Sequence, residues 1–366
     1  MTTVETLIVG GGPAGAAATC GLAAAGREVV LVERSQGPHH KVCGEFLSIE
    51  TQALLQALGI DPAALGAVEI GEVAVYAAGR SVAAALPFRA LSLSRYRLDQ
   101  ALLQRADRDG ARIRRGISVQ QVSRDGTYWT VRCDGGATIR CRQLVLATGK
   151  WGLRGIADAR DASLVGLKMH LQVAREAQRA LQGRVELALL EGGYAGLELV
   201  EEGIANFCLV LPRAALARLA PGWRPLHAYL GAALPHLGER LAGATALWDK
   251  PLAVVCPAAG HLHRDEEGAY RIGDRLAHIP PFTGDGLAIA LGSAALATGH
   301  IRQGRSPADY LTAARRLTGR PIRIASTLSN LAAHRGGRAL LVGAAALAPG
   351  IIGALTRATR LPLAAH

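Results

Sequence analysis

Apolar positions near the N-terminus change from strand-like to helix-like spacing and back. A short apolar run at residues 6–9 is followed by an alanine-rich stretch at 13–25 and by a second apolar run at 28–32. The two runs have the length and the branched residues of buried parallel strands, whereas the middle stretch has helix length and ends before Gly26. The pattern predicts a strand–helix–strand unit.

The same two patterns continue along the chain. Helical spacing predicts further helices at 48–58, 95–106, 226–242 and 287–298. Short apolar or alternating runs predict strands at 68–77, 117–122, 128–133, 137–141, 143–147, 164–173, 185–190, 205–211 and 269–274. The longer strands after residue 163 predict a second domain inserted into the first.

We therefore expect an α/β fold in four segments. Residues 1–162 form the first part of a nucleotide-binding domain, with strands of the second domain interleaved near 68–92. Residues 163–265 form the second, substrate-facing domain, and 266–330 return to the nucleotide site. Residues 331–366 form a C-terminal helical segment.

The turn after the first strand has a dinucleotide-binding pattern. Gly10, Gly12 and Gly15 have G-x-G-x-x-G spacing, and Glu33 ends the next strand, 18 residues after Gly15. The first glycine allows a tight turn, the second lets backbone amides approach a pyrophosphate, and the third lets helix and strand pack closely. The acid can accept a ribose hydroxyl hydrogen bond. In a chain with 44 glycines the triplet alone would indicate only a turn, but the complete unit predicts a bound dinucleotide.

Composition restricts the partners. The 366 residues, half of them hydrophobic, suffice for a large core and two domains. The chain has 41 Lys and Arg against 29 Asp and Glu, a net charge of +12, which is compatible with nucleic acid or an anionic membrane. However, the arginines are scattered and aromatic residues make up only 4%. We expect no nucleic-acid partner, because a single-strand site needs interleaved stacking residues.

The cysteines and the N-terminus indicate the compartment. The six cysteines are dispersed without a C-x-x-C pair, which predicts neither a metal site nor a disulfide framework. The sequence begins directly in its first strand, without a basic region followed by an apolar segment and a cleavage site. We expect a cytoplasmic protein.

Three blocks in order carry a family resemblance. They are the Gly10, Gly12, Gly15 and Glu33 unit, then Val42-Cys43-Gly44-Glu45, then Gly273-Asp274 with Pro281-x-x-Gly284-x-Gly286. Over residues 4–300 the chain resembles FAD-dependent oxidoreductases of the p-hydroxybenzoate hydroxylase architecture. It is most similar to the branch that holds geranylgeranyl reductases, flavin monooxygenases and flavin halogenases. This implies a Rossmann-like FAD-binding domain with an interleaved substrate domain built on an antiparallel β-sheet.

The resemblance also implies which residues bind FAD. Asp274 matches the aspartate that bonds the ribityl chain, and the glycines after Pro281 match a loop at the flavin pyrimidine edge. Arg95 matches an arginine that reaches FAD, although a surface arginine paired with Asp99 is an equal alternative. The implied cofactor-binding residues are Gly10, Gly12, Pro13, Ala14, Gly15, Glu33, Arg34, Arg95, Gly149, Asp274, Pro281, Gly284, Asp285 and Gly286.

Cys43, Glu45 and Tyr194 are the candidate catalytic residues. The Cys-Gly-Glu loop resembles one that lies against the isoalloxazine in the reductase branch, and Tyr194 lies on a segment that resembles the reductases' substrate-side strand. The structural alternatives are a small buried hydrophobe for Cys43, a solvated loop carboxylate for Glu45 and a cross-strand aromatic for Tyr194. For His170 we favour a structural role, and we place His278 nearer the flavin.

At two places the sequence departs from the motifs of the family, and these departures limit which reaction and electron donor we expect. Thr148 stands where the aromatic hydroxylases carry the aspartate of an Asp-Gly motif, which argues against direct reduction by NAD(P)H. The halogenase Trp-x-Trp-x-Ile-Pro segment is replaced at 192–197, which disfavours halogenation. We therefore favour a separate donor protein as the source of electrons and keep NAD(P)H as the alternative.

We predict an FAD-dependent oxidoreductase acting on a small hydrophobic substrate. A hydroxylase is favoured by a small margin, because monooxygenases are common on this scaffold. A geranylgeranyl-reductase-like carbon–carbon double-bond reductase is the alternative. A non-redox flavoprotein isomerase or cyclase, and a nucleotide-binding regulatory protein, are further alternatives.

The C-terminal segment 339–356 contains no charged residue. It is marginal as a membrane span, because it is short and includes Pro349-Gly350. We favour a pair of short helices that pack on the protein or cap the substrate cavity over a peripheral membrane contact.

Overall fold

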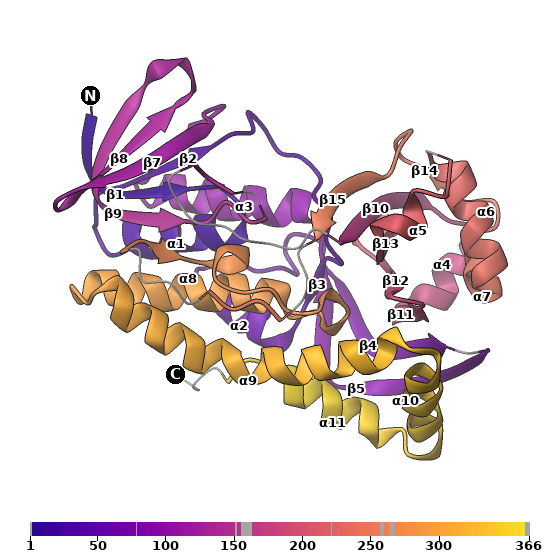
Figure 1. Cartoon of the computed structure of the whole chain (residues 1–366). Helices are drawn as coiled ribbons and strands as arrows, with labels where there is room; N and C mark the ends of the chain where they lie inside the picture. Colours follow the sequence, from indigo (N-terminus) through magenta and orange to yellow (C-terminus); the bar gives the residue numbers. More distant parts are fainter. Residues whose placement is uncertain are drawn as a thin grey trace.

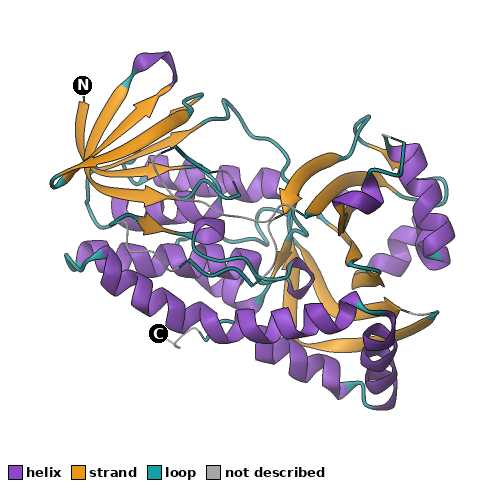
Figure 2. Ribbon diagram, viewed as in Figure 1, coloured by secondary structure: helices purple, strands orange, loops and turns teal. Residues whose placement is uncertain are grey.

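The computed structural model describes residues 2–77, 79–150, 152–154, 163–220, 222–256, 260–263 and 268–362. These residues form two sheets that lie at opposite ends of the molecule, with helices packed on both (Figure 1). The long helix α9 (Pro307–Ala333) runs beneath both halves (Figure 2). The mixed α/β fold predicted from the sequence is confirmed.

The first sheet contains the predicted strand–helix–strand unit. Its order is β6-β2-β1-β9-β8-β7, with β16 beside β9. The strands are β1 (Thr2–Val9), β2 (Val29–Glu33), β6 (Arg112–Arg115), β7 (Val119–Asp125), β8 (Tyr128–Cys133), β9 (Thr138–Leu146) and β16 (Tyr270–Arg271). All are parallel except the β7–β8–β9 meander.

Two boundaries in this sheet differ from expectation. The strands expected at 137–141 and 143–147 are one strand, because the backbone pairs with β1 on both sides of exposed Arg142. The strand expected at 269–274 ends after Arg271, and Gly273 begins a 3₁₀ turn with a positive φ of 59°.

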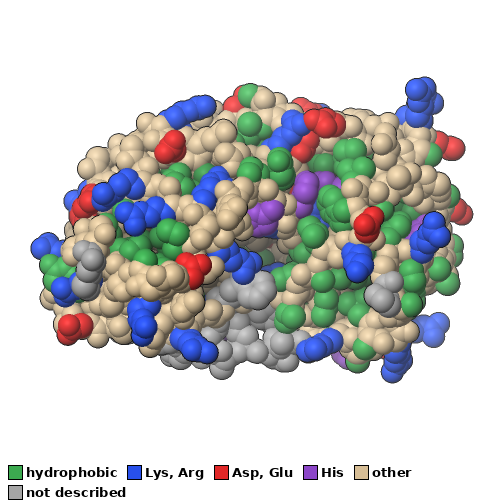
Figure 3. All heavy atoms as spheres, turned by 90° about the horizontal axis from the view of Figure 1, so that it is seen from above, with side chains coloured by type: hydrophobic (Ala, Val, Ile, Leu, Met, Phe, Trp, Pro, Cys, Tyr) green, Lys and Arg blue, Asp and Glu red, His purple; other side chains and the backbone are tan. Residues whose placement is uncertain are grey.

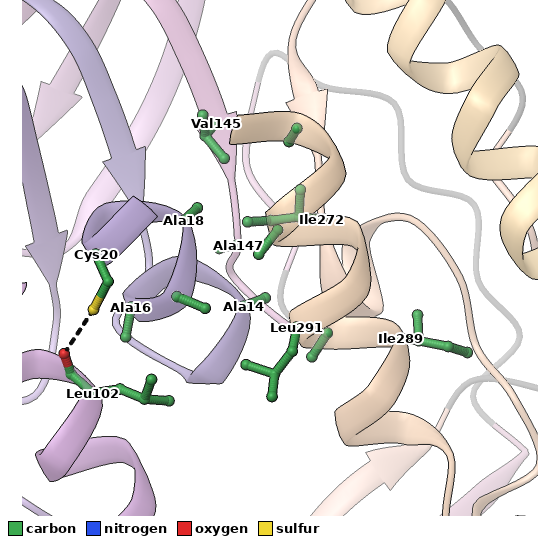
Figure 4. Packing of buried hydrophobic residues seen from close by; sticks show 14 of the residues in the cluster. Ala14, Ala16, Ala18, Cys20, Leu102, Val145, Ala147, Ile272, Ile289 and Leu291 are labelled. Carbon is green, nitrogen blue, oxygen red and sulfur yellow. Dashed lines mark hydrogen bonds between the residues drawn. The ribbon is translucent and has the colours of Figure 1, made fainter. Parts of the chain in front are cut away.

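Small side chains let three helices pack closely against the first sheet. These helices are α1 (Pro13–Ala23), α3 (Arg95–Arg108) and α8 (Gly286–Arg302). Figure 4 shows Ala14 of α1 beside Leu291 of α8, and the Cys20 thiol donates to the Leu102 carbonyl at 3.2 Å. The alanine-rich pattern therefore places the N-termini of α1 and α8 close together.

The second sheet combines segments far apart in sequence. Its order is β14-β10-β13-β12-β11-β4-β5-β3, with β15 beside β10. The strands are β3 (Phe46–Leu47), β4 (Val68–Ala77), β5 (Arg80–Ser92), β10 (Leu164–Gln172), β11 (Gly183–Leu190), β12 (Gly193–Leu199), β13 (Ala205–Pro212), β14 (Thr245–Ala246) and β15 (Leu252–Cys256). The sheet is antiparallel except where β4 meets β11, so it is mixed rather than antiparallel throughout.

Helices cover both faces of the second sheet. On one face lie α4 (Arg175–Leu181), α5 (Arg213–Leu216), α6 (Trp223–Ala233) and α7 (Pro235–Arg240); α10 (Arg335–Leu347) and α11 (Gly350–Thr359) lie against β4 and β5. The helix expected at 226–242 is two helices, because Pro235 cannot donate a backbone hydrogen bond in a helix interior. Helix α2 (Ile49–Ala57) begins after Ser48, whose hydroxyl accepts from Thr51 N.

Candidate functional site

Two adjoining cavities lie where the sheets meet. The larger cavity, of about 650 Å³, is bounded by the β1–α1 turn, the end of β2, the loop 39–46 and residues 272–290. The smaller cavity, of about 210 Å³, lies between the second sheet and helices α9–α11. Four residues line both: Gly44, Phe46, Pro281 and Gly284. Figure 3 shows the surface hollowed between the two halves, with histidine side chains beside the hollow.

The three glycines of the β1–α1 turn are glycine for different reasons. A Cβ at Gly10 would lie 2.4 Å from the Ala147 carbonyl oxygen, and one at Gly15 would lie 1.9 Å from the Gly10 oxygen. These two glycines are required by the fold. A Cβ at Gly12 would meet only Arg95 Nη2, at 3.7 Å, and its backbone has ordinary extended dihedrals. The chain itself does not require a glycine at position 12, so the requirement fits a ligand at the start of α1.

Glu33 holds this turn in place. Its Oε2 accepts from Gly11 N at 2.6 Å and its Oε1 from Ser35 N at 2.9 Å. Burial opposes ionisation, but the two backbone donors and the Lys41 charge outweigh it and lower the pKa of Glu33. The carboxylate faces the larger cavity and is ionised, so it can also accept a hydroxyl hydrogen bond.

Arg95 pairs with Asp99 as one of its two alternatives predicted, but beside the larger cavity and not at the surface. Its side chain is only 12% exposed, lines the larger cavity, and forms two hydrogen bonds to Asp99, of 2.7 and 2.9 Å. Lys41 also pairs with Asp99, at 3.1 Å. Burial disfavours the Asp99 carboxylate, but Arg95 and Lys41 outweigh it and lower the pKa of Asp99. The cluster keeps positive charge beside Gly12.

Glu45 is not a solvated loop carboxylate. Its side chain is fully buried and contacts the Lys168 ammonium, His170 Nε2 at 2.8 Å, and Arg95 N at 2.6 Å. Its positive φ of 58°, unusual for a residue with a Cβ, turns the carboxylate inward. Burial would raise the pKa of Glu45, but Lys168 and His170 outweigh it and lower the pKa. The carboxylate is therefore ionised and fixes the loop to the start of α3.

Lys168 was missed in the sequence. It lies two residues before His170 on β10, so the two side chains lie on the same face of the strand, and it is fully buried. The available signal was a lysine within an otherwise apolar strand, which requires a buried anionic partner. His40, Glu45 and His170 bring possible metal-ligand atoms within 4.8 Å of one another. The Lys168 ammonium already pairs with Glu45, so the protein supplies the positive charge there.

Cys43 lies in the same loop and is partly exposed toward the larger cavity. Its carbonyl accepts from Asn206 Nδ2 at 3.3 Å and from the Cys208 thiol at 2.8 Å. Strand β13 therefore holds the loop from the side of the second sheet.

Tyr194 and Glu198 face the smaller cavity from β12. Tyr194 is buried and lies edge-on to Phe282, with ring centroids 6.1 Å apart. Glu198, 3% exposed, accepts from Asn206 Nδ2 at 2.6 Å. Burial raises the pKa of Glu198 to about 8, so this carboxyl is largely protonated at neutral pH. Burial also raises the pKa of Tyr194 and Cys208 well above their usual values.

Most of the predicted site residues line the larger cavity. They are Gly10, Gly12, Pro13, Ala14, Glu33, Arg34, Cys43, Glu45, Arg95, Gly149, Asp274, Pro281, Gly284 and Gly286. His278 lines it too, 4.0 Å from Asp274 Oδ1, whereas His170 is bound to Glu45. Thr148 lines the cavity beside Lys150.

Three predicted site residues do not line the larger cavity. Gly15 packs against Gly10, and Tyr194 belongs to the smaller cavity. Asp285 precedes α8 and pairs with Arg360 Nη1 at 2.9 Å. Burial raises the pKa of Asp285 to about 7, with Arg360 acting in the opposite direction. Its side chain is directed toward the C-terminal helices and not into this cavity, so the structure does not bring it together with the other predicted cofactor-binding residues.

Comparison with known proteins agrees with this geometry. Residues 3–161 match the family model described as an FAD binding domain. The cofactor is FAD. The chain is accordingly an FAD-dependent oxidoreductase. The amides at Gly12, the buried positive cluster and the Glu33 carboxylate fit its ADP half, and residues 273–286 fit its flavin half.

Relatives of this FAD-dependent oxidoreductase have different reactions. A protein named menaquinone reductase from Mycolicibacterium smegmatis is 27% identical over 332 residues, covering 85% of this chain and 79% of the relative. The flavin-dependent brominase Bmp2 is similar in structure, with a TM-score of 0.82, 18% identity and 98% and 93% coverage of the two chains. PqsL of Pseudomonas aeruginosa, in complex with 2-aminobenzoylacetate, has a TM-score of 0.73, 19% identity and 93% and 99% coverage. The two structures establish the shared fold.

Proposed function

We propose that this FAD-dependent oxidoreductase reduces a carbon–carbon double bond in a hydrophobic substrate held in the smaller cavity. The observation that carries the proposal is Glu198, a buried and largely protonated carboxyl group on the wall of that cavity. Reduction of a double bond requires a hydride on one carbon and a proton on the other. Glu198 is suited to donate the proton.

The position of the two cavities supports this role. FAD, when bound, supplies the hydride. Residues shared by both cavities, including Gly44 and Pro281, would bring substrate and cofactor together. The smaller cavity is otherwise lined mainly by aliphatic side chains, which fits an apolar substrate. After transfer, Glu198 would carry a negative charge and recover its proton from solvent.

The neighbouring groups have supporting roles in this proposal. Glu45 is ionised and bound on both oxygens, so it positions the Cys43-Gly44 loop rather than donating a proton. Cys43 faces the larger cavity beside Gly44 and would contact the cofactor or the reacting end of the substrate. Tyr194 would bound the apolar substrate.

The reductase replaces the hydroxylase as the favoured reaction. The preference for a hydroxylase rested on how often that reaction occurs on this scaffold, whereas the menaquinone reductase relative covers most of the chain. Menaquinone is therefore the first substrate to test. Thr148 continues to favour a separate electron donor over NADPH, and a cytoplasmic enzyme without a nucleic-acid partner remains our proposal.

Anaerobic single turnover tests the proposed function. Dithionite-reduced enzyme mixed with menaquinone should be reoxidised, and the product should be two mass units heavier in H₂O. In D₂O it should be four mass units heavier, with two deuterium atoms bound to carbon, because the transferable hydrogen of reduced flavin exchanges with solvent. Glu198→Gln should slow this step at least tenfold with FAD retained. Glu186→Gln, a buried carboxyl group on β11 that lines neither cavity, is the matched control. Oxygen-18 in the product under labelled oxygen gas would instead identify a hydroxylase.

A further inference from the structure

The hairpin of α10 and α11 has an apolar tip. Its six consecutive residues 346–351 are all exposed, and none has a polar side chain. Leu347 is 90% exposed, and Leu340, two turns earlier on the same face of α10, is 63% exposed. In Figure 1 the hairpin projects at the end of the molecule farthest from β1. Large aliphatic side chains clustered in water indicate an interaction surface.

The inner side of the same hairpin lines the smaller cavity. Val342 and Ala345 of α10, and Ile352 and Leu355 of α11, all face that cavity. Ile351 both lines the cavity and is 36% exposed. The same two short helices therefore line the cavity on their inner side and carry the exposed apolar tip at their junction.

The charge of this part of the chain selects an anionic partner. From Tyr310 to the C-terminus the sequence has eight arginines and no aspartate or glutamate. Arg338 is buried against backbone carbonyls and Arg360 pairs with Asp285. The exposed arginines are Arg316, Arg320, Arg323, Arg335 and Arg357. An apolar tip flanked by arginines without carboxylates has the composition of a helix that rests on an anionic bilayer.

No single helix in the described part of the chain has the length and hydropathy of a membrane span. The two helices pass that test only as a pair, and they are bent by 118°. A bent pair with an exposed tip suits shallow insertion into the headgroup region.

We propose that the α10–α11 hairpin docks on an anionic lipid bilayer and admits the hydrophobic substrate from it to the smaller cavity. Leu340 and Leu347 enter the acyl boundary, and Arg335 and Arg357 contact the headgroups. Docking is independent of the reaction, whereas substrate delivery rests on the proposed function.

Vesicle flotation of the FAD-loaded protein tests docking. The probes are phosphatidylcholine vesicles with and without phosphatidylglycerol, at low and high salt. We expect binding that requires phosphatidylglycerol and weakens with salt. Leu347→Glu and Leu340→Glu, which line neither cavity, should each abolish flotation. Leu247→Glu is the matched control, because Leu247 is 47% exposed in another part of the fold. Arg335→Gln with Arg357→Gln should weaken binding about 25-fold, at about fivefold for each arginine.

Several outcomes would overturn docking. They are equal binding to vesicles without phosphatidylglycerol, or the same loss of flotation in Leu247→Glu. The wild type could instead be a dimer that does not float with vesicles and that Leu347→Glu converts to a monomer. That result would show that the tip contacts a second copy of the chain and not a bilayer.

A second measurement separates docking from delivery. Reoxidation of the reduced enzyme by menaquinone in vesicles should fall with Leu347→Glu, while reoxidation by menaquinone in detergent micelles stays unchanged. Flotation without reoxidation in either medium would refute the proposed function and leave docking intact. If Leu347→Glu slowed reoxidation equally in vesicles and in micelles, the proposal that the hairpin delivers substrate from the bilayer would be wrong.

Discussion

Replacing Glu198 by Gln should make the protein more stable while it removes the proposed proton donor. Burial raises the pKa of Glu198 from its ordinary value of 4.5 to about 8. A group with a raised folded-state pKa contributes full stability below pH 4.5, and this contribution is lost as the pH rises through 8. At pH 7 the unfolded carboxyl group has ionised while the folded one has not.

The magnitude follows from the pKa difference. At pH 7 the pH lies 2.5 units above the unfolded value, and at about 1.36 kcal/mol per unit the native state loses about 3 kcal/mol. Gln cannot ionise and keeps an oxygen to accept from Asn206 Nδ2. If the added amide hydrogen lacks an acceptor, about 1 kcal/mol is lost again. We expect a net gain of about 2 kcal/mol at pH 7.

Denaturation at two pH values measures this gain. We compare the free energy of unfolding of wild type and Glu198→Gln, both saturated with FAD. The advantage of the variant should be about 2 kcal/mol larger at pH 7 than at pH 5. The reference is Glu186→Gln, which removes a buried carboxylate paired with Arg240 and should destabilise at both pH values. A Glu198→Gln variant that is less stable than wild type at pH 7, or a gap that does not change with pH, would refute the reasoning.

Further substitutions test the larger cavity and the buried pair of Lys168 and Glu45. Gly12→Val should abolish FAD binding, measured by absorbance, while circular dichroism stays native, because a Cβ there has room; Gly15→Ala should instead impair folding. Glu33→Ala should weaken FAD binding by about 1.5 to 3 kcal/mol in a titration, and an unchanged affinity would exclude a contact with the ribose. Lys168→Met should cost about 3 to 5 kcal/mol of unfolding free energy by leaving Glu45 unpaired, and adding Glu45→Gln should recover most of it.

The nucleotide-binding half could be predicted because its signals are local. The runs at 6–9 and 28–32 and the three glycines specify one strand–helix–strand unit without information from elsewhere in the chain. The break at Pro235 was also available in the sequence, because proline ends a helix. The continuity of β9 through Arg142 was not, since it depends on pairing with β1, more than 130 residues earlier in the chain.

The second half of the site depends on contacts across the fold. Glu45 was a candidate catalytic residue with a solvated loop carboxylate as its alternative, and its burial requires Lys168 from a strand far along the chain. Glu198 lies within an apolar run on β12, a signal of the same kind as Lys168, but the register with Asn206 on β13 decides what it faces. A single sequence does not specify that register.

Glu45 and Glu198 are both buried but have opposite protonation states, because Lys168 forms an ion pair with Glu45 alone. Lys168 pairs directly with Glu45 and lowers its pKa, whereas burial dominates at Glu198 and raises its pKa. Asn206 links the two regions, since its amide donates both to Glu198 and to the Cys43 carbonyl. One ionised and one neutral carboxyl group in the same site is the arrangement that separates a positioning role from an acid role. The charge of Glu45 also raises the pKa of Glu198, whereas the Lys168 charge and the Asn206 hydrogen bond lower it, so burial is what keeps the proposed donor protonated at neutral pH.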